Sequence, residues 1–297
     1  MNIIIKIKET LYMKPIIGIL IIIAISAALA VAGSQGSFAF SGAPLFALCA
    51  SVGFILHWIA FIPAFGYQTE HYFDLTGSIS YLGAIILAVV LHPGMDIRGL
   101  IISVMIAVWA ARLGSFLFMR VKKAGQDRRF NDIKTRFFRF MFTWTLGGAW
   151  VFITMAAGLA AITSTTQQAI GIPFFIGTAL WVLGFGLEVV ADSQKTSFRR
   201  QPENAEKFIT TGLWQYSRHP NYFGEIILWL GIAVMAAPVL SGWQLVTLIS
   251  PVFVFLLLTK VSGIPMLEKS GLERWGSDPK YQRYISITSP LFPLPQK

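Results

Sequence analysis

Long apolar runs recur along the whole chain, separated by short polar or charged connections. An apolar run of roughly 17–25 residues can cross a bilayer as a helix, because hydrogen bonds within the helix satisfy its backbone polar groups. The runs that meet this description lie at approximately residues 15–33, 43–65, 76–92, 98–119, 140–163, 171–191, 221–237 and 240–260. The pattern therefore predicts an all-α fold, a polytopic membrane helical bundle of about eight transmembrane helices.

The composition excludes a soluble globular fold. Hydrophobic residues make up 55% of the 297 residues and charged residues only 13%, too few charges to cover a soluble surface. No repeat or low-complexity tract divides the chain, so we expect a single membrane domain over residues 1–297. Within it we distinguish N-terminal spans at 1–70, central spans with a basic loop at 71–183, and a C-terminal part at 184–297 that carries most of the candidate chemistry.

The net charge of +10 is segregated along the chain. Lys and Arg gather at 120–139, at 192–219 and after residue 259, whereas the connections at 34–42 and 164–170 carry no charge. Because basic loops stay on the cytosolic side of a membrane, this alternation predicts that the N and C termini are both cytosolic. A nucleic-acid-binding protein would not segregate its basic residues into alternate loops, so we expect no nucleic-acid partner.

The first apolar run has two interpretations. Lys6, Lys8 and Lys14 precede it and small residues end it at 30–33, a pattern that also fits a signal peptide. We favour a retained first span, because the other features are those of a polytopic inner-membrane protein. Cys49 is the only cysteine, so neither an internal disulfide nor a cysteine metal site is possible, and we expect no metal site.

A polar stripe ends the sixth run. If that helix continues beyond the apolar residues, Glu188, Asp192, Lys195 and Arg199 lie on one face, at offsets of four, three and four. An interfacial helix end with bases reaching the head groups explains Lys195 and Arg199. It explains Glu188 poorly, because an acid about one turn inside the membrane is costly and is usually functional. We therefore favour a functional role for Glu188 and Asp192.

A second polar cluster opens the seventh run. Pro220 suits the first turn of a helix, and Asn221 and Glu225 then fall on one face, four residues apart. Arg218 and the unpaired amides of the helix start are suited to a phosphate. A purely structural interpretation explains Ser217, as a helix cap, but not the whole cluster.

The tail after the last run contains a short amphipathic segment with Tyr281 and Tyr284. Two interpretations stay open for it. The segment can lie on the lipid head groups, or the two tyrosines can close a pocket over a planar ring.

At these residues the chain resembles the steroid 5-alpha reductase superfamily of membrane reductases, and most closely its bacterial branch of unknown function. The fold is shared with isoprenylcysteine carboxyl methyltransferases. The strongest match begins at Gly184 and runs to the C-terminus. The motifs that carry it are Glu188-x3-Asp192-x6-Arg199, Gly212-Leu213-Trp214, the segment from Arg218 to Glu225 and the segment from Trp275 to Tyr284. A weaker match includes Asp74 to Gly77 and Trp109-x2-Arg112-Leu113-Gly114.

The resemblance implies an NADPH-dependent oxidoreductase acting on CH-CH groups in a multi-pass protein of the bacterial inner membrane. Hydride would add to a polarised carbon–carbon double bond of a lipophilic small molecule, such as a steroid-like, isoprenoid or fatty enone, taken up from among the membrane lipids. The residues that the resemblance and the polar pattern assign to cofactor binding are Glu188, Asp192, Lys195, Arg199, Arg218, His219, Asn221, Tyr222, Glu225, Lys260 and Tyr281.

The catalytic acid is where the chain departs from the animal steroid enzymes. Those enzymes carry a tyrosine three residues before an arginine in an early span, and this chain has Trp109 before Arg112. Tryptophan has no phenol and cannot replace it as proton donor. Glu70 and Asp74, at the start of the third run, are the remaining candidate catalytic residues, and helix capping is the alternative role for Asp74.

Two other functions fit the same motifs. Membrane methyltransferases of the isoprenylcysteine or phospholipid type share the Arg-His-Pro-x-Tyr and Tyr-x2-Tyr patterns and use S-adenosylmethionine. A lipid-binding protein can keep the fold without turnover. We favour NADPH, because Lys195, Arg199 and Arg218 match its phosphates, whereas S-adenosylmethionine has no phosphate and carries a sulfonium cation. No sequence feature predicts the oligomeric state.

Overall fold

The computed structural model describes residues 2–124 and 130–296, with side chains from residue 13 to 122 and from 130 to 296. Lys6 and Lys8, and the middle of the basic loop at 120–139, lie outside the described side chains. The long helices are α1 (Asn2–Gly33), α2 (Leu45–Gly66), α3 (Phe73–Leu91), α4 (Ile97–Ala124), α5 (Phe137–Ile162), α6 (Ile172–Arg200) and α7 (Pro220–Ala236). Shorter helices complete the chain: α8 (Ser250–Leu256), α9 (Ile264–Trp275) and α10 (Pro279–Ile287).

Within the described residues, eight segments are long and apolar enough to cross a membrane, which confirms the predicted multi-pass helical bundle. Two of them differ from the expected ranges by more than three residues at one end. The sixth continues to Arg200, so the helix includes the polar stripe, which was the condition for Glu188, Asp192, Lys195 and Arg199 to lie on one face. The eighth covers Gly242–Trp275 and is irregular, because Gly242 has a φ of 53° and Pro251, lacking an amide hydrogen, favours a new helix start at Ser250.

The eighth segment changes its helix type several times. It begins with 3-10 turns at Gly242–Ile249, continues as α8, and passes through a π-helical segment at Leu257–Val261 before α9 begins at Ile264. Such π segments widen a helix by one residue and often occur near functional sites.

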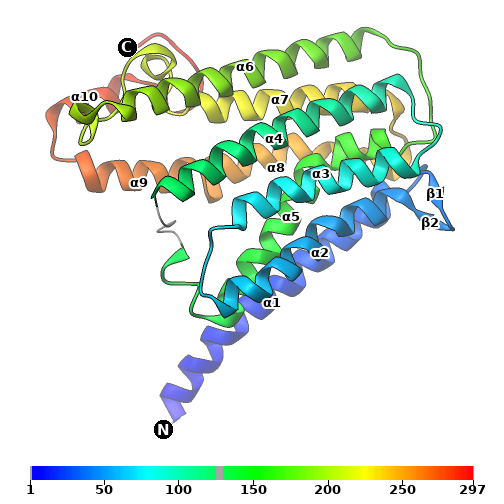
Figure 1. The fold of residues 1–297 in the computed structure, drawn as a ribbon, viewed down its shortest axis with the longest axis horizontal. Coiled ribbons are helices and arrows are strands. Elements are labelled where there is room, and N and C mark those ends of the chain that lie inside the picture. The colour runs from blue at the N-terminus through cyan, green and yellow to red at the C-terminus, as the bar shows by residue number, and fades with distance from the viewer. Residues whose placement is uncertain (1, 125–129, 297) are drawn as a thin grey trace. The chain divides into compact units, whose positions relative to one another are not determined.

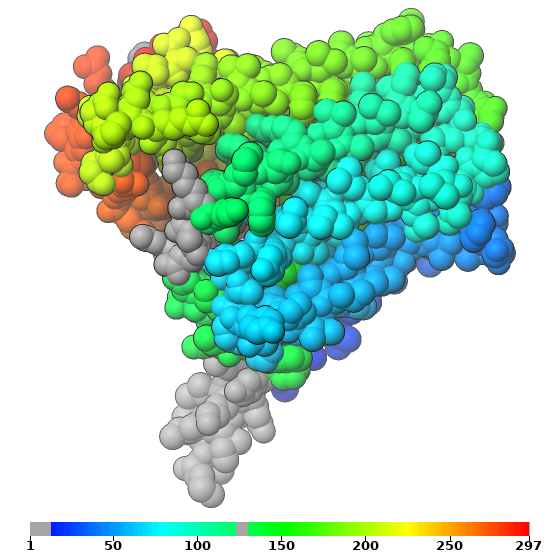
Figure 2. All heavy atoms as spheres, in the orientation of Figure 1, coloured from blue at the N-terminus to red at the C-terminus, as the bar shows by residue number. Residues whose placement is uncertain are grey.

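The chain divides into two compact units, and the expectation of one membrane domain stays a prediction. Unit 1 contains residues 1–170 and 236–249. Its centre is α5, which packs against α1, α2, α3 and α4, and 83% of the most apolar 18-residue stretch of α5 is buried. Figure 2 shows the side chains of α2, α3 and α4 as adjoining bands. The described strands form one hairpin, in which β1 (Ala39–Phe40) pairs with β2 (Ala43–Pro44).

Unit 2 contains residues 171–235 and 250–297. Its first two helices, α6 and α7, run antiparallel and side by side (Figure 1), and they touch at two pairs of glycines. A Cβ added at Gly184 would lie 2.5 Å from the carbonyl oxygen of Gly224, and a Cβ at Gly231 would lie 2.5 Å from that of Gly177. Only glycine permits such an approach, so the two helices lie backbone to backbone.

Candidate functional site

Three carboxylates of unit 2 are buried where α6 and α7 meet. Glu188, Asp192 and Glu225 are 2%, 6% and 8% exposed. The crossing of α6 and α7 at their glycines, the glycine crossing, explains why these carboxylates are buried. A Cβ added at Gly224 would lie 2.7 Å from the amide nitrogen of Glu188, so the two backbones are in close contact there. Asn221, in the first turn of α7, donates its side-chain amide to Asp192 across a distance of 3.2 Å. The structure thus brings together acidic residues that the two predicted polar clusters contain separately.

The loop before α7 is held on α6 by polar contacts. The indole nitrogen of Trp214 donates to the carbonyl of Ala191 at 3.1 Å, and the amide of Leu213 donates to the side-chain oxygen of Gln194 at 2.9 Å. The Lys195 ammonium lies 4.3 Å from the ring centroid of Trp214, a cation–π contact that restrains this side chain. Arg199, one turn further along α6, is exposed.

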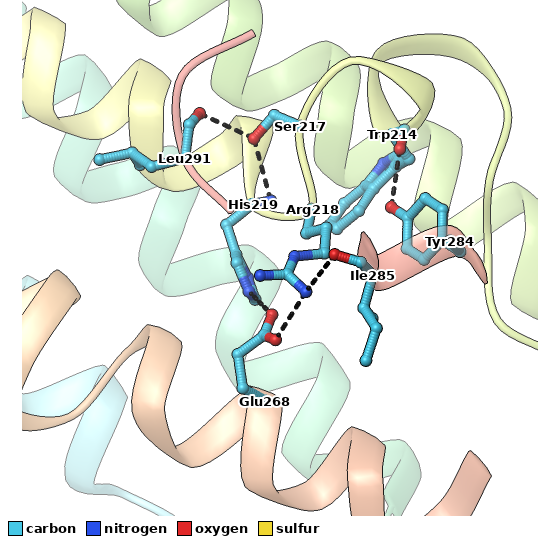
Figure 3. Close-up of polar contacts among 8 residues, drawn as sticks. All are labelled: Trp214, Ser217, Arg218, His219, Glu268, Tyr284, Ile285 and Leu291. Carbon is cyan, nitrogen blue, oxygen red and sulfur yellow. Dashed lines mark hydrogen bonds and ion pairs between the residues drawn. The ribbon is translucent and has the colours of Figure 1, made fainter. Parts of the chain in front are cut away.

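A carboxylate from α9 joins the residues that precede α7 (Figure 3). One oxygen of Glu268 accepts from Nε2 of His219 at 2.7 Å, and the other lies 3.1 Å from Nη1 of Arg218. A carboxylate in this pair can only accept, so Nε2 is the protonated ring nitrogen and Nδ1 carries the lone pair when His219 is neutral. Burial lowers the pKa of His219, the positive charges of Lys195 and Arg218 act in the same direction, and Glu268 opposes them.

The loop before α7 is also held by a segment some 70 residues later in the chain (Figure 3). The hydroxyl of Tyr284 donates to the carbonyl of Trp214 at 2.7 Å, and the hydroxyl of Ser217 donates to the carbonyl of Leu291 at 2.7 Å. Arg218 adds a bond from Nη1 to the carbonyl of Ile285 at 3.3 Å. Ser217 also accepts from the backbone amide of His219 at 3.1 Å, a bond within the loop, so Ser217 lies before α7 and does not cap it as predicted.

The predicted aromatic residues of the site take different positions. Tyr222 stacks on His219, with ring centroids 5.6 Å apart and an interplanar angle of 11°. Tyr281 packs against Phe208 at 5.0 Å, and burial raises its pKa. Both Tyr281 and Tyr284 therefore point into unit 2. Lys260, in the π segment, is exposed.

The two candidate catalytic acids belong to unit 1. Glu70 is 3% exposed, and its carboxylate lies 2.9 Å from the ammonium of Lys134. Asp74 lies in the first turn of α3, whose N-cap position is Tyr72, so Asp74 is not the N-cap residue. A negative charge in the first turn is still favourable, because it complements the helix dipole. Trp109 is buried edge-on against Tyr81, with ring centroids 5.2 Å apart.

Sequence reasoning missed two features of this site. Glu268 is separated from His219 by 49 positions, and no local pattern connects them. The glycine crossing had a visible signal, because Gly177 and Gly184 are seven residues apart, as are Gly224 and Gly231. Residues seven apart lie on the same face of a helix, so each of the two helices has a face lined by small residues. Such faces permit close packing.

The chemistry of unit 2 suits a ligand that carries both anionic and hydroxyl groups. Lys195 and Arg218 supply positive charge, while Asp192 and Glu225 supply acceptors. Among the side chains that the structure describes, Arg218 Nε and His219 Nδ1 are buried without a hydrogen-bond partner, one a donor and the other an acceptor in neutral histidine. Buried polar atoms of this kind call for an explanation, and a bound ligand is one.

The family described as "Protein of unknown function (DUF1295)" matches residues 60–288. The 3-oxo-5-alpha-steroid 4-dehydrogenase 1 of Bos taurus is 34% identical over 70 residues, which are 24% of this chain and 27% of that protein. The steroid 5-alpha-reductase DET2 of Gossypium hirsutum is 37% identical over 62 residues, 21% of this chain and 24% of the relative.

A third relative matches over a longer stretch. The uncharacterized protein C594.04c of Schizosaccharomyces pombe is 23% identical over 229 residues, 66% of this chain and 63% of that protein. The chain thus spans about a quarter of the length of the two steroid enzymes and less than two thirds of the yeast protein. No solved structure matches it.

Proposed function

We propose, because this chain belongs to the DUF1295 family of the steroid 5-alpha reductase superfamily, that it is an NADPH-dependent membrane reductase. Its substrate would be a lipophilic molecule with a polarised carbon–carbon double bond, of the steroid-like, isoprenoid or fatty enone type. We further propose that the nucleotide site faces the cytosol, as the segregation of basic residues favours, and that the membrane is the bacterial inner membrane.

The observation that carries this proposal is the combination of cations and buried acceptors in unit 2. Arg218 and Lys195 both contribute positive charge at His219. Asp192, three residues before Lys195 on α6, is already oriented by Asn221. NADPH requires both kinds of group, because its phosphates are anions and its riboses carry hydroxyl donors. S-adenosylmethionine would leave the cations without a phosphate to bind.

In this proposal, Asp192 and Glu225 would accept hydrogen bonds from ribose hydroxyls, and Lys195, Arg199 and Arg218 would bind phosphates. The bound NADPH would be the source of the hydride for one carbon of the double bond, and the other carbon would take up a proton. The remaining task of the chain is to hold the substrate oxygen or to deliver that proton.

Asp74 is a better candidate for the proton donor than Glu70. In its ion pair with Lys134, Glu70 is an acceptor, whereas a donor must carry the hydrogen itself. Asp74 lies close to Glu70 in sequence, at the start of α3. We propose Asp74 as the acid and Glu70 as the residue that anchors the segment before α3 to Lys134.

Titration of the purified, detergent-solubilised protein with NADPH, NADH and S-adenosylmethionine, at low and high salt, tests the cofactor. We expect saturable NADPH binding that weakens with salt and is tighter than NADH binding, because the 2′-phosphate adds charge. Arg199→Ala should weaken NADPH binding about tenfold, the size of one charge-assisted hydrogen bond. Arg200→Ala is the matched control, since Arg200 is the next residue and is also exposed. Saturable binding of S-adenosylmethionine with none of NADPH would refute the reductase in favour of a methyltransferase.

A further inference from the structure

Glu268 reaches two consecutive residues just before α7 with its two oxygens. It is half-buried, with 23% of its side chain exposed, whereas the side chains of His219 and Arg218 are 6% and 16% exposed. One acid therefore restrains a buried imidazole and a largely buried guanidinium at the same time. An ordinary surface ion pair does neither, because both side chains stay mobile in water.

The helix that carries Glu268 is held close to α7 by a second contact. A Cβ added at Gly263, just before α9, would lie 3.0 Å from the ring of Tyr222 and 2.5 Å from the carbonyl oxygen of Leu258. Tyr222 in turn stacks on His219. The imidazole thus has a ring on one face and a carboxylate at Nε2, and both contacts depend on where α9 begins.

The donor and acceptor roles at this cluster follow from the carboxylate. Because Glu268 requires a proton on Nε2, the neutral imidazole has its lone pair on Nδ1. In the described part of the chain, this buried Nδ1 has no hydrogen-bond partner, and neither has Nε of Arg218. Glu268 therefore makes Nδ1 of His219 an acceptor, and Nε of Arg218 beside it stays available as a donor.

We propose that Glu268 is a positioning residue of the proposed nucleotide site, which fixes His219 in its Nε2–H form and holds Arg218 beside it. The proposal rests on the proposed function only for the identity of the ligand. Glu268 itself does not touch the cofactor in this account. Its role resembles that of a carboxylate that orients a ligating histidine at a metal site, where loss of the partner weakens binding by roughly 10- to 100-fold.

The first measurement concerns His219 alone and needs no nucleotide. Long-range proton–nitrogen NMR of protein labelled with ¹⁵N-histidine distinguishes the two tautomers, and His219→Asn assigns its signal among the four histidines. We expect the Nε2–H form in the wild type. In Glu268→Gln the midpoint of His219 protonation should move to lower pH, because Glu268 opposes the lowering by burial, Lys195 and Arg218.

The second measurement is the NADPH dissociation constant of the same proteins. Glu268→Gln has nearly the same volume and should raise it about tenfold. Glu273→Gln is the matched control, because Glu273 lies on the same helix, is 67% exposed and pairs only loosely with Lys269 at 3.9 Å. The control should leave both the His219 signal and the dissociation constant unchanged. Thermal unfolding of each variant verifies that it is folded.

The outcomes separate the inference from the proposed function. An unchanged tautomer and protonation midpoint in Glu268→Gln would overturn the positioning role. A changed His219 signal with unaltered NADPH affinity would overturn its relevance to the nucleotide. If the wild type binds no NADPH, the proposed function fails, and the His219 measurement alone then decides whether Glu268 orients the imidazole.

Discussion

The glycine crossing of α6 and α7 makes a sharp prediction about stability. In Gly184→Ala, the new Cβ would lie 2.5 Å from both the carbonyl oxygen of Gly224 and the amide nitrogen of Leu228, whereas ordinary contact begins at 3.4 Å. These are backbone atoms that cannot rotate away, so the helices must separate by about 0.9 Å, the difference between the two distances. Overpacking of this kind costs about 1–3 kcal/mol.

The same helix offers a control two residues further on. A Cβ at Gly186 would meet nothing within 4 Å. Replacing a helical glycine by alanine there stabilises the helix by about 0.5–1 kcal/mol. Gly186→Ala should therefore be at least as stable as the wild type. The two variants should differ in their free energies of unfolding by roughly 1.5–4 kcal/mol.

Separation of α6 and α7 should also disturb the candidate functional site. The bond from Asn221 to Asp192 joins α7 to α6 at 3.2 Å, and a further 0.9 Å would stretch it beyond the 3.5 Å limit for a hydrogen bond. Unfolding by SDS in mixed micelles, monitored by circular dichroism, measures the stability, and NADPH titration measures the site. A Gly184→Ala protein as stable as Gly186→Ala would refute the close crossing.

Three further predictions concern other parts of the chain. The pKa of His219 is lowered from 6.5 in the folded protein, so the contribution of neutral His219 to stability is present above pH 6.5 and is lost on acidification. The melting temperature should therefore fall between pH 7.5 and 5, and it should fall less in His219→Gln. Lys134→Met should destabilise the protein by about 3–5 kcal/mol, because it removes the Lys134 ammonium from the buried carboxylate of Glu70, and the double variant with Glu70→Leu should recover most of that loss. If the double variant also retains reductase activity, Glu70 is structural; full loss of activity in a stable protein would contradict that role. Single cysteines at Gln167 and Arg136, in a cysteine-free background, should label from opposite sides of the membrane, and labelling from one side would refute the predicted cytosolic termini.

Local patterns predicted the spans well, because a helix in lipid must satisfy its backbone within itself and must be apolar over most of its length. The same reasoning placed Pro220, which is indeed the first residue of α7. It also placed Glu188 and Asp192 on one helix that continues past the apolar residues. These features depend on neighbours three or four residues away, and the sequence contains that information directly.

The partners of the site residues could not be predicted in this way. The ammonium of Lys195, a predicted phosphate ligand, lies 4.3 Å from the ring centroid of Trp214. The guanidinium of Arg218 forms an ion pair with Glu268. Both contacts join residues that are far apart in sequence, so helical periodicity does not indicate them. The path of the last span was missed for another reason, since the change from 3-10 to α to π geometry leaves the hydrophobic pattern intact.

The hydrogen bonds between the loop before α7 and the segment from Tyr284 to Leu291 have a consequence for biosynthesis. They join positions 67 to 74 residues apart, so translation at about 5–20 residues per second needs roughly 3–15 s to supply the second partner. During that interval α6 and α7 can already pair through their glycines. The carbonyl of Trp214 and the hydroxyl of Ser217 cannot yet form their hydrogen bonds to Tyr284 and Leu291, which have not been synthesised. A chain whose synthesis is interrupted between α7 and Glu268 therefore contains α6 and α7, which can already pair, but none of the later residues that hold Arg218 and His219.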